Sequence, residues 1–217
     1  MTVPSPKKSS SSASSSSSLH RLNYHDECEA AMNEQINEEL CAYYTYMAMA
    51  AWCAREDVAL PGMAAFFTAS SREENQHALF MMDYQAKRGG RVTFQPIRLA
   101  KGSESGEWKS AKACLQTALS LEKQVFASLL KVHQAAEKHG DPQLCDFIAA
   151  RFLQEQVISC KELADLVTQC KRVGDDGLGL YLFDQEMAKL AAVKASTPCA
   201  SGCGAPEPSA ANNEDDE

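Results

Sequence analysis

Four long runs of the chain combine helix-forming residues with apolar side chains spaced three and four residues apart. They cover about residues 26–53, 61–87, 111–138 and 142–173, and Pro and Gly cluster between them in "LPG", "RGG" and "HGDP". Apolar residues at this spacing share one face of an α-helix, the face that packs inward. Runs of roughly 25–30 residues would each span about 40 Å as helices. The sequence therefore predicts an all-α fold of long helices packed side by side.

The connections indicate how these helices are joined. The first and third connections are short, whereas "RVTFQPIRLAKGSESGEWKS" separates the second run from the third. A fifth, shorter run, "LGLYLFDQEMAKLAAV", follows "GDDG". Short loops join antiparallel neighbours, while a long connection crosses the length of a bundle. The prediction is a four-helix bundle with a long crossover and a short fifth helix.

Polar side chains interrupt the apolar stripe of each long helix near its middle. In chain order they are Glu39, Tyr46, Glu74, His77, Glu122 and Gln156. No stripe contains Lys or Arg. A buried carboxylate without a partner costs several kcal/mol, and a whole domain has a margin of only about 5–15 kcal/mol. Either these carboxyl groups are protonated, or they are less buried than the pattern implies, or a cation sits among them.

The types of these polar residues favour a metal site. A single polar residue in a stripe is commonly a register device, but here all four helices contribute oxygen or nitrogen ligands at a matching depth. Carboxylates, an imidazole and an amide without a thiolate suit iron better than structural zinc. A Glu-x-x-His pair facing Glu on neighbouring helices is the di-iron pattern of bundle cores.

The ligand set is asymmetric. Glu74 and His77 form the only Glu-x-x-His pair of the chain, and the fourth helix offers Gln156 where a second pair would be needed for a symmetric site. A neutral amide is a poor iron ligand, so we expect the second metal ion to be held loosely. Loose binding favours iron as a substrate that must leave over iron as a permanent cofactor.

At these motifs the chain resembles the ferritins, specifically the eukaryotic heavy-chain type. The resemblance covers about residues 22–184. It rests on "QINEELCAYYTYMAMA", "REENQHA", "AKRGGR", "LEKQV", "DPQLCDF", "LQEQV" and "GLYLFD". It implies a ferroxidase site with these roles: Glu39 and His77 hold the first iron, Glu74 bridges, Glu122 holds the second iron with Gln156 near it, and Tyr46 hydrogen-bonds into the site.

The resemblance also implies an assembly and a reaction. Subunits of the family associate into a hollow shell of twenty-four, which other ferritin subunits can join, and iron mineral forms inside. Fe(II) would be the substrate, dioxygen the oxidant and ferric iron the product. The protein's contribution would be geometry, weak affinity at the second metal position and an enclosed volume.

The chain departs from the family pattern along the expected path of iron. Asp146 matches an acid that lines the ion-entry funnel, but Ala149 stands where a second acid is usual. Glu73 is retained as an acid at which mineral would nucleate on the cavity side, whereas Gln76 and Leu79 fill positions that are commonly acidic.

The two ends of the chain differ in composition from the helical region. Residues 1–21 contain "SSSSASSSSS", and residues 195–217 are rich in Pro, Gly, Ser and acids. Such segments cannot bury enough apolar surface to fold, so we expect a disordered Ser-rich arm and a disordered acidic tail around a ferritin-like di-iron domain at residues 22–194. The arm has little Arg and no amphipathic pattern, so a transit peptide is disfavoured and a cytoplasmic location is expected.

Composition excludes some partners. No apolar run approaches the ~20 residues of a membrane span. The net charge of −8 and the lack of a basic segment argue against nucleic acid. Seven of the nine cysteines lie within helical runs at no metal-ligand spacing, which predicts free thiols in a reducing compartment. Cys199 and Cys203 form a C-x-x-x-C pair in the tail.

Two other functions remain open. The first is a non-catalytic storage shell that keeps the core carboxylates as vestiges, and the complete ligand set argues against it. The second is a di-iron oxidase or peroxidase of the rubrerythrin kind that forms no shell. That enzyme would require the missing second Glu-x-x-His pair and would leave the fifth helix without a role.

Overall fold

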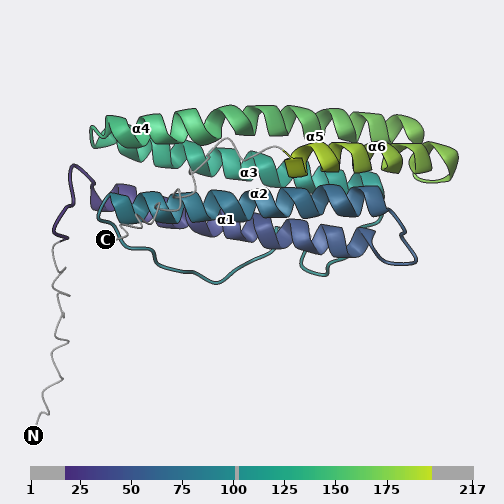
Figure 1. The fold of residues 1–217 in the computed structure, drawn as a ribbon, viewed down its shortest axis with the longest axis horizontal. Helices are drawn as coiled ribbons and strands as arrows, with labels where there is room; N and C mark the ends of the chain where they lie inside the picture. The colour runs from purple at the N-terminus through teal and green to yellow at the C-terminus, as the bar shows by residue number, and fades with distance from the viewer. Residues whose placement is uncertain (1–17, 101–102, 197–217) are drawn as a thin grey trace, which may run out of the picture.

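Four helical rods lie side by side, and a further helix packs against them (Figure 1). The computed structural model describes residues 18–100 and 103–196. Its elements are α1 (Asp26–Cys53), α2 (Pro61–Lys87), α3 (Ala111–Lys138), α4 (Pro142–Ile148), the π-helical turn η1 (Ala149–Leu153), α5 (Gln154–Val173) and α6 (Gly177–Ser196). The segments α4, η1 and α5 follow one another without a break and form the fourth rod. The predicted all-α bundle is confirmed.

The connection from α2 to α3 runs along α1 for most of the bundle (Figure 1). Three backbone N–H groups of this connection donate to side chains that lie successively along α1. The pairs are Thr93 to Asn33 Oδ1 at 2.9 Å, Arg98 to Cys41 Sγ at 3.3 Å and Ala100 to Thr45 Oγ1 at 3.0 Å. The predicted long crossover is therefore confirmed, and α3 runs in the same direction as α2.

The helices begin and end where the sequence provides suitable residues. The Ser110 side chain accepts a hydrogen bond from the third N–H of α3, and Asp141 caps α4 in the same way. Pro61 and Pro142 stand in the first turns of α2 and α4, where a missing N–H is tolerated. Gly89 follows α2 with φ of +75°, a left-handed conformation that favours glycine.

The predicted core stripes are largely confirmed. Seven residues of α3 at helical spacing form its inward stripe and all are buried: Leu115, Ala118, Glu122, Val125, Leu129, Val132 and Ala136. Phe67, Met81 and Tyr84 of the α2 stripe are buried too. The fourth rod buries Ile148, Phe152, Leu163, Leu166 and Cys170. The exceptions are half-buried: Tyr43, Ala50 and Ser159.

The fourth rod contains one π-helical turn that the sequence did not predict. In η1 the backbone hydrogen bonds reach one residue further than in an α-helix, so the turn holds one additional residue. The buried Phe152 lies in this turn, and its ring packs edge to face with the imidazole of His77 at a centroid distance of 5.5 Å. α5 begins at Gln154, directly after the turn.

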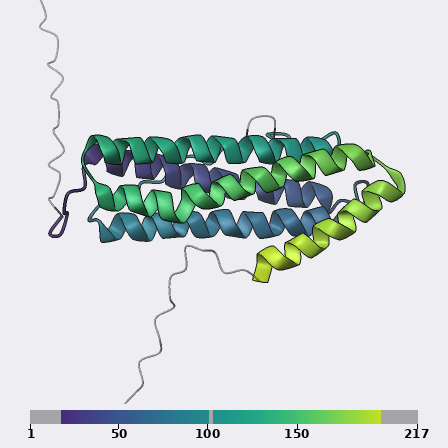
Figure 2. The same ribbon diagram turned by 90° about the horizontal axis from the view of Figure 1, so that it is seen from above.

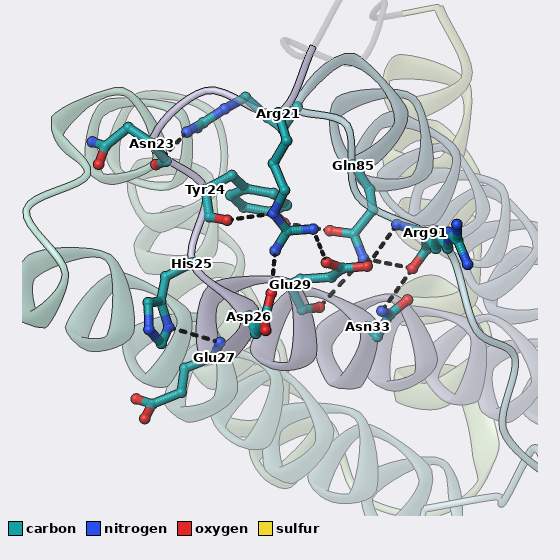
Figure 3. Close-up of polar contacts among 11 residues, drawn as sticks. Arg21, Asn23, Tyr24, His25, Asp26, Glu27, Glu29, Asn33, Gln85 and Arg91 are labelled. Carbon is teal, nitrogen blue, oxygen red and sulfur yellow. Dashed lines mark hydrogen bonds and ion pairs between the residues drawn. The ribbon is translucent and has the colours of Figure 1, made fainter. Parts of the chain in front are cut away.

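A polar network joins the start of α1 to the end of α2 and the beginning of the crossover (Figure 3). The backbone N–H of Arg91 donates to Glu29 Oε1 at 2.7 Å. The Arg91 carbonyl accepts hydrogen bonds from Asn33 at 2.9 Å and from Gln85 at 3.1 Å. Arg21, in the segment before α1, forms an ion pair with Glu29. These contacts hold the first residues of the crossover against both helices.

At the same end of the bundle, Arg88 and Asp141 form an ion pair between the end of α2 and the start of α4. The Nη2–Oδ2 distance is 2.7 Å, and the two side chains are only 13% and 1% exposed. The Arg88 guanidinium also donates to the Asn23 carbonyl at 3.0 Å and lies 4.8 Å from the centre of the Tyr24 ring. One cation therefore holds three segments of the chain together.

α6 runs back beside α2, and its docking depends on one close approach (Figure 2). The buried Asp184 carboxylate accepts hydrogen bonds from the backbone N–H groups of Gly62 at 2.9 Å and Met63 at 2.8 Å, which caps the start of α2. A Cβ atom on Gly62 would lie 1.8 Å from the Asp184 carbonyl oxygen, so a glycine is required here. Phe183 and Met187 of α6 are buried in the core.

Several predictions concern the ends of the chain. Most of the predicted arm, residues 1–21, and of the tail, residues 195–217, lies outside the described residues, as do Cys199 and Cys203. The division at residues 22 and 194 stays a prediction. The seven cysteines in the described part of the chain are all free. Among the described residues no helix combines the length and apolar character that crossing a membrane requires.

Candidate metal centre

Three predicted ligands from two adjacent helices meet in the core. Glu39 of α1 and Glu74 and His77 of α2 each present a ligand atom within 4.8 Å of the other two, and all three side chains are buried. His77 Nδ1 lies 3.2 Å from Glu74 Oε2 and 3.9 Å from Glu39 Oε2. The one-turn separation of Glu74 and His77 places them on the same face of α2, opposite Glu39.

The other three predicted residues form a second group from α1, α3 and α5. Tyr46 donates its hydroxyl hydrogen to Glu122 Oε1. Gln156 Nε2 donates to the other Glu122 carboxylate oxygen and, at 3.0 Å, to the Glu122 backbone carbonyl. The Glu122 side chain is buried, so Tyr46 and Gln156 satisfy a carboxyl group that water cannot reach.

The pKa values of the two glutamates of the first group are shifted in opposite directions. Burial raises the pKa of Glu39 well above its ordinary value, and the adjacent charge of Glu74 raises it further. Burial also acts to raise the pKa of Glu74, but hydrogen bonding and attraction from His77 outweigh it, so this pKa is lowered. Because the two carboxyl groups lie close together, ionisation of Glu74 favours the protonated form of Glu39.

The pKa of Glu122 is raised for similar reasons. Burial, followed by the charge of Glu74, raises the pKa of Glu122 to about 8, although hydrogen bonds from Tyr46 and Gln156 oppose the shift. Burial and the Glu122 charge also raise the pKa of Tyr46 well above its ordinary value. The charge of Glu74 thus raises the pKa of Glu39 in its own group and the pKa of Glu122 in the second group.

These residues fit a pair of cations. Glu39 Oε2 is buried and receives a hydrogen bond from no donor in the described part of the chain. Its other oxygen accepts a hydrogen bond from Gln35 at 2.7 Å, which orients the carboxyl group. Carboxylate oxygens with one imidazole are ligands for iron and similar divalent ions. The first group has three such ligands, whereas Glu122 has only an amide and a phenol beside it, so a weaker hold on the second metal ion stays a prediction.

Metal binding at this centre should release protons. The raised pKa values of Glu39 and Glu122 mean that protons compete with the metal ion below about pH 8, so affinity should rise as the pH increases towards that value. Calorimetric titration with Zn²⁺ at pH 6.5, in two buffers of different ionisation enthalpy, measures the release. We expect about one proton or more per bound ion. E122Q should release fewer, while identical heats in both buffers for the wild type would contradict this prediction.

Of the two residues predicted for iron transport, Asp146 lies on the surface of the fourth rod, whereas Glu73 adjoins the first group. Asp146 is exposed on α4, near the end of the bundle, and Ala149 is exposed one turn later. Glu73 precedes Glu74 on α2 and is partly exposed, and its carboxylate forms an ion pair with Lys194 of α6. Burial raises the pKa of Glu73, and the adjacent lysine opposes that shift.

Sequence reasoning missed two charged residues beside the centre. Glu155 Oε2 lies 3.6 Å from His77 Nε2, and the Glu155 side chain is 20% exposed. The available signal was an acid adjacent to the predicted ligand Gln156, but Glu155 lies one position off the inward stripe of its helix. Lys194 gave no signal, because its position depends on how α6 packs against α2.

The structure also groups His25, Glu27 and His139 at the end of the bundle. The two imidazole rings stack with centroids 3.5 Å apart, and His139 Nε2 lies 2.9 Å from Glu27 Oε2. Lys138 Nζ contacts the same oxygen at 2.6 Å. This group is largely exposed and already neutralised by a lysine, so the buried group is the stronger candidate for metal.

Comparison with known proteins agrees with the fold and the centre. Residues 29–173 match the Ferritin-like domain family. Soma ferritin from Lymnaea stagnalis is 50% identical over 169 residues, which cover 78% of this chain and 95% of the relative. The middle ferritin subunit of Aquarana catesbeiana is 47% identical over 171 residues, or 78% and 96% of the two chains. A ferritin heavy chain from Echinococcus granulosus is 47% identical over 169 residues, or 78% and 95%. Helical bundle, buried ligand group and relatives together assign the chain to the ferritin family.

Proposed function

We propose that this protein stores iron by oxidising Fe(II) with dioxygen at a two-metal site inside each subunit and depositing the ferric product within a hollow shell. The observation that supports this most is the buried group of Glu39, Glu74 and His77, with Glu122 beyond it. Relatives named as ferritin heavy chain and middle subunit support the same function.

Each side chain has a role that its position supports. Glu39 and His77 would hold the first Fe(II), and Glu74, whose charge acts on both groups, would bridge the two ions. Glu122 would hold the second ion, with Gln156 beside it. Tyr46 donates a hydrogen bond to Glu122 and would orient that carboxylate.

The reaction balances with two iron ions and one dioxygen. Each Fe(II) gives up one electron, and dioxygen takes up the two electrons and two protons to become hydrogen peroxide. Holding both ions at one bridging carboxylate lets them share the oxidant. Hydrolysis of the ferric product then releases protons. Loose binding at Glu122 would allow the product to leave, as a substrate must.

Assembly and transport complete the proposal. The chain would associate into a shell of twenty-four subunits, alone or with other ferritin subunits, in the cytoplasm. Asp146 would attract Fe(II) to an entry funnel, and the acid missing at position 149 would weaken that attraction. Glu73 would receive ferric iron from the centre at the start of mineral growth.

One experiment distinguishes this function from its alternatives. Fe(II) is added anaerobically to the purified protein, air is admitted, and oxygen uptake is recorded together with the native mass. The proposal expects rapid uptake of about one dioxygen per two Fe(II), by an assembled shell. A shell without rapid uptake would indicate non-catalytic storage, and rapid uptake by a small oligomer would indicate a rubrerythrin-like oxidase.

A further inference from the structure

α6 brings a lysine to the edge of the metal centre. The Lys194 ammonium group, near the end of α6, forms an ion pair with the Glu73 carboxylate of α2. The two side chains are only 19% and 26% exposed. Lys194 Nζ also lies 5.8 Å from the centre of the Phe66 ring, which adds a cation–π contact. A pair this sheltered from water is held more firmly than a surface ion pair.

The packing of α6 on α2 fixes the position of this lysine. Asp184 caps the start of α2 at Gly62, and Lys194 meets Glu73 further along. Ten residues separate the two α6 positions and eleven the two α2 positions, which correspond to about 15 and 16 Å of helix. The two helices therefore cover similar lengths between these contacts and stay next to each other (Figure 2). The lysine reaches Glu73 because α6 continues this far as a helix.

A pocket between the fourth rod and α6 lies beside the metal centre and is lined in part by Lys194. The pocket has a volume of about 430 Å³, and its charged lining residues are Arg151, Glu155, Glu162 and Lys194. Glu155 lies at the boundary, because its Oε2 atom is 3.6 Å from Nε2 of the candidate ligand His77. Glu73 is the chain neighbour of the candidate ligand Glu74. The carboxylates of Glu73 and Glu155 thus lie between the centre and the pocket, and Lys194 neutralises that of Glu73.

We propose that Lys194 is a resident cation that a metal ion must displace from Glu73 before iron can leave the centre by this route. The inference rests on the proposed function, since it concerns where oxidised iron goes next. An ammonium group and a metal ion are both positively charged, so each weakens the binding of the other to the Glu73 carboxylate, and the lysine competes with iron there. Lys194 forms its ion pair with Glu73 rather than with one of the candidate ligands, so we expect it to affect the departure of iron more than the oxidation step.

Terbium binding tests this competition without any oxidation. Tb³⁺ is a redox-inert trivalent ion that prefers oxygen ligands, as ferric iron does, and its luminescence reports binding. K194M keeps the length of the side chain and removes its charge. We expect K194M to bind one more Tb³⁺ ion per subunit than the wild type does, or to bind Tb³⁺ about tenfold more tightly. K189M is the matched control, because Lys189 of α6 forms an exposed pair with Glu186, and it should behave like the wild type.

Further variants locate the effect. K194R retains the charge and should bind Tb³⁺ as the wild type does. The K194M/E73Q double variant should lose the gain seen in K194M. Equal Tb³⁺ binding by K194M and wild type, or an undiminished gain in the double variant, would overturn the proposal.

Iron turnover provides a second readout. A first addition of two Fe(II) per subunit should be oxidised equally fast by wild type and K194M. A second addition should be oxidised several-fold faster by K194M, because its centre empties sooner. Equal rates on the second addition would overturn the role in iron departure. A wild-type protein that oxidises no Fe(II) would instead overturn the proposed function, whereas the terbium titrations would still decide whether Lys194 occupies Glu73.

Discussion

Substitution of Glu74 by alanine should reduce the rate of rapid Fe(II) oxidation by at least about 100-fold, the upper end of the loss seen when groups that support a metal ligand are removed. Glu74 lies 3.2 Å from His77 Nδ1, and its charge acts on both Glu39 and Glu122. Without this carboxylate, two Fe(II) ions lose the group proposed to hold them at one distance from each other. Oxygen uptake in the first seconds after mixing measures the effect.

The same variant should still fold and assemble. Alanine is a stronger helix former than glutamate, and the substitution removes a buried charge that no metal compensates in the iron-free protein. D83A is a suitable control, because Asp83 is on the same helix and forms an exposed pair with Lys87. It should oxidise iron normally. Wild-type oxygen uptake by an assembled E74A shell would show that the site has been assigned wrongly.

The largest effect on stability is expected at the Arg88–Asp141 pair. D141A removes both the partner of a mostly buried guanidinium and the cap of α4. Breaking a buried ion pair costs roughly 3 kcal/mol, and loss of the cap adds about 1 kcal/mol. Because Arg88 is 13% exposed, some solvent screening reduces the first contribution. We expect the free energy of unfolding to fall by about 3 kcal/mol in total.

Two further variants separate the contributions. D141N retains a side-chain acceptor for the cap but loses the charge, so it should lose about 2 kcal/mol. D165A breaks an exposed pair with Lys161 on α5 and should cost less than about 1 kcal/mol. Denaturant unfolding, followed by circular dichroism at one protein concentration and one assembly state, compares them. A D141A variant no less stable than D165A would refute the structural role of the Arg88 ion pair.

The helices could be predicted because their signals are local. Pro61 and Pro142 begin helices, Gly89 and Gly140 follow helix ends, and the apolar spacing between them is regular. The same helical spacing places Glu39 on the inward face of α1, and Glu74 and His77 on the inward face of α2. Their meeting in the core could therefore be predicted from this spacing. Their roles in iron oxidation remain a prediction.

Other features depend on contacts between distant parts of the chain. The docking of α6 requires Asp184 to meet the start of α2, more than one hundred residues earlier. Nothing in the local sequence of α6 indicates this pairing, so the contact of Lys194 with Glu73 could not be predicted. Glu155 neighbours Gln156 in the sequence, but it lies off the inward stripe, so the helical spacing alone does not mark it as a site residue. The π-helical turn has no characteristic residue pattern, because its small Ala149 and Ala150 suit an α-helix equally well.

The π-helical turn also changes which insertions and deletions the fourth rod can tolerate. Ile148 and Gln156 both face the core although they are eight residues apart. Eight residues of α-helix would overshoot two turns by about 80°, whereas seven bring the side chain back to nearly the same direction at about 100° per residue. The additional residue of η1 absorbs this difference. We therefore expect that a deletion of one residue within Ala149–Leu153 would leave Gln156 directed at Glu122. A deletion of one residue between Leu163 and Cys170 would instead rotate the end of α5 out of register with the core.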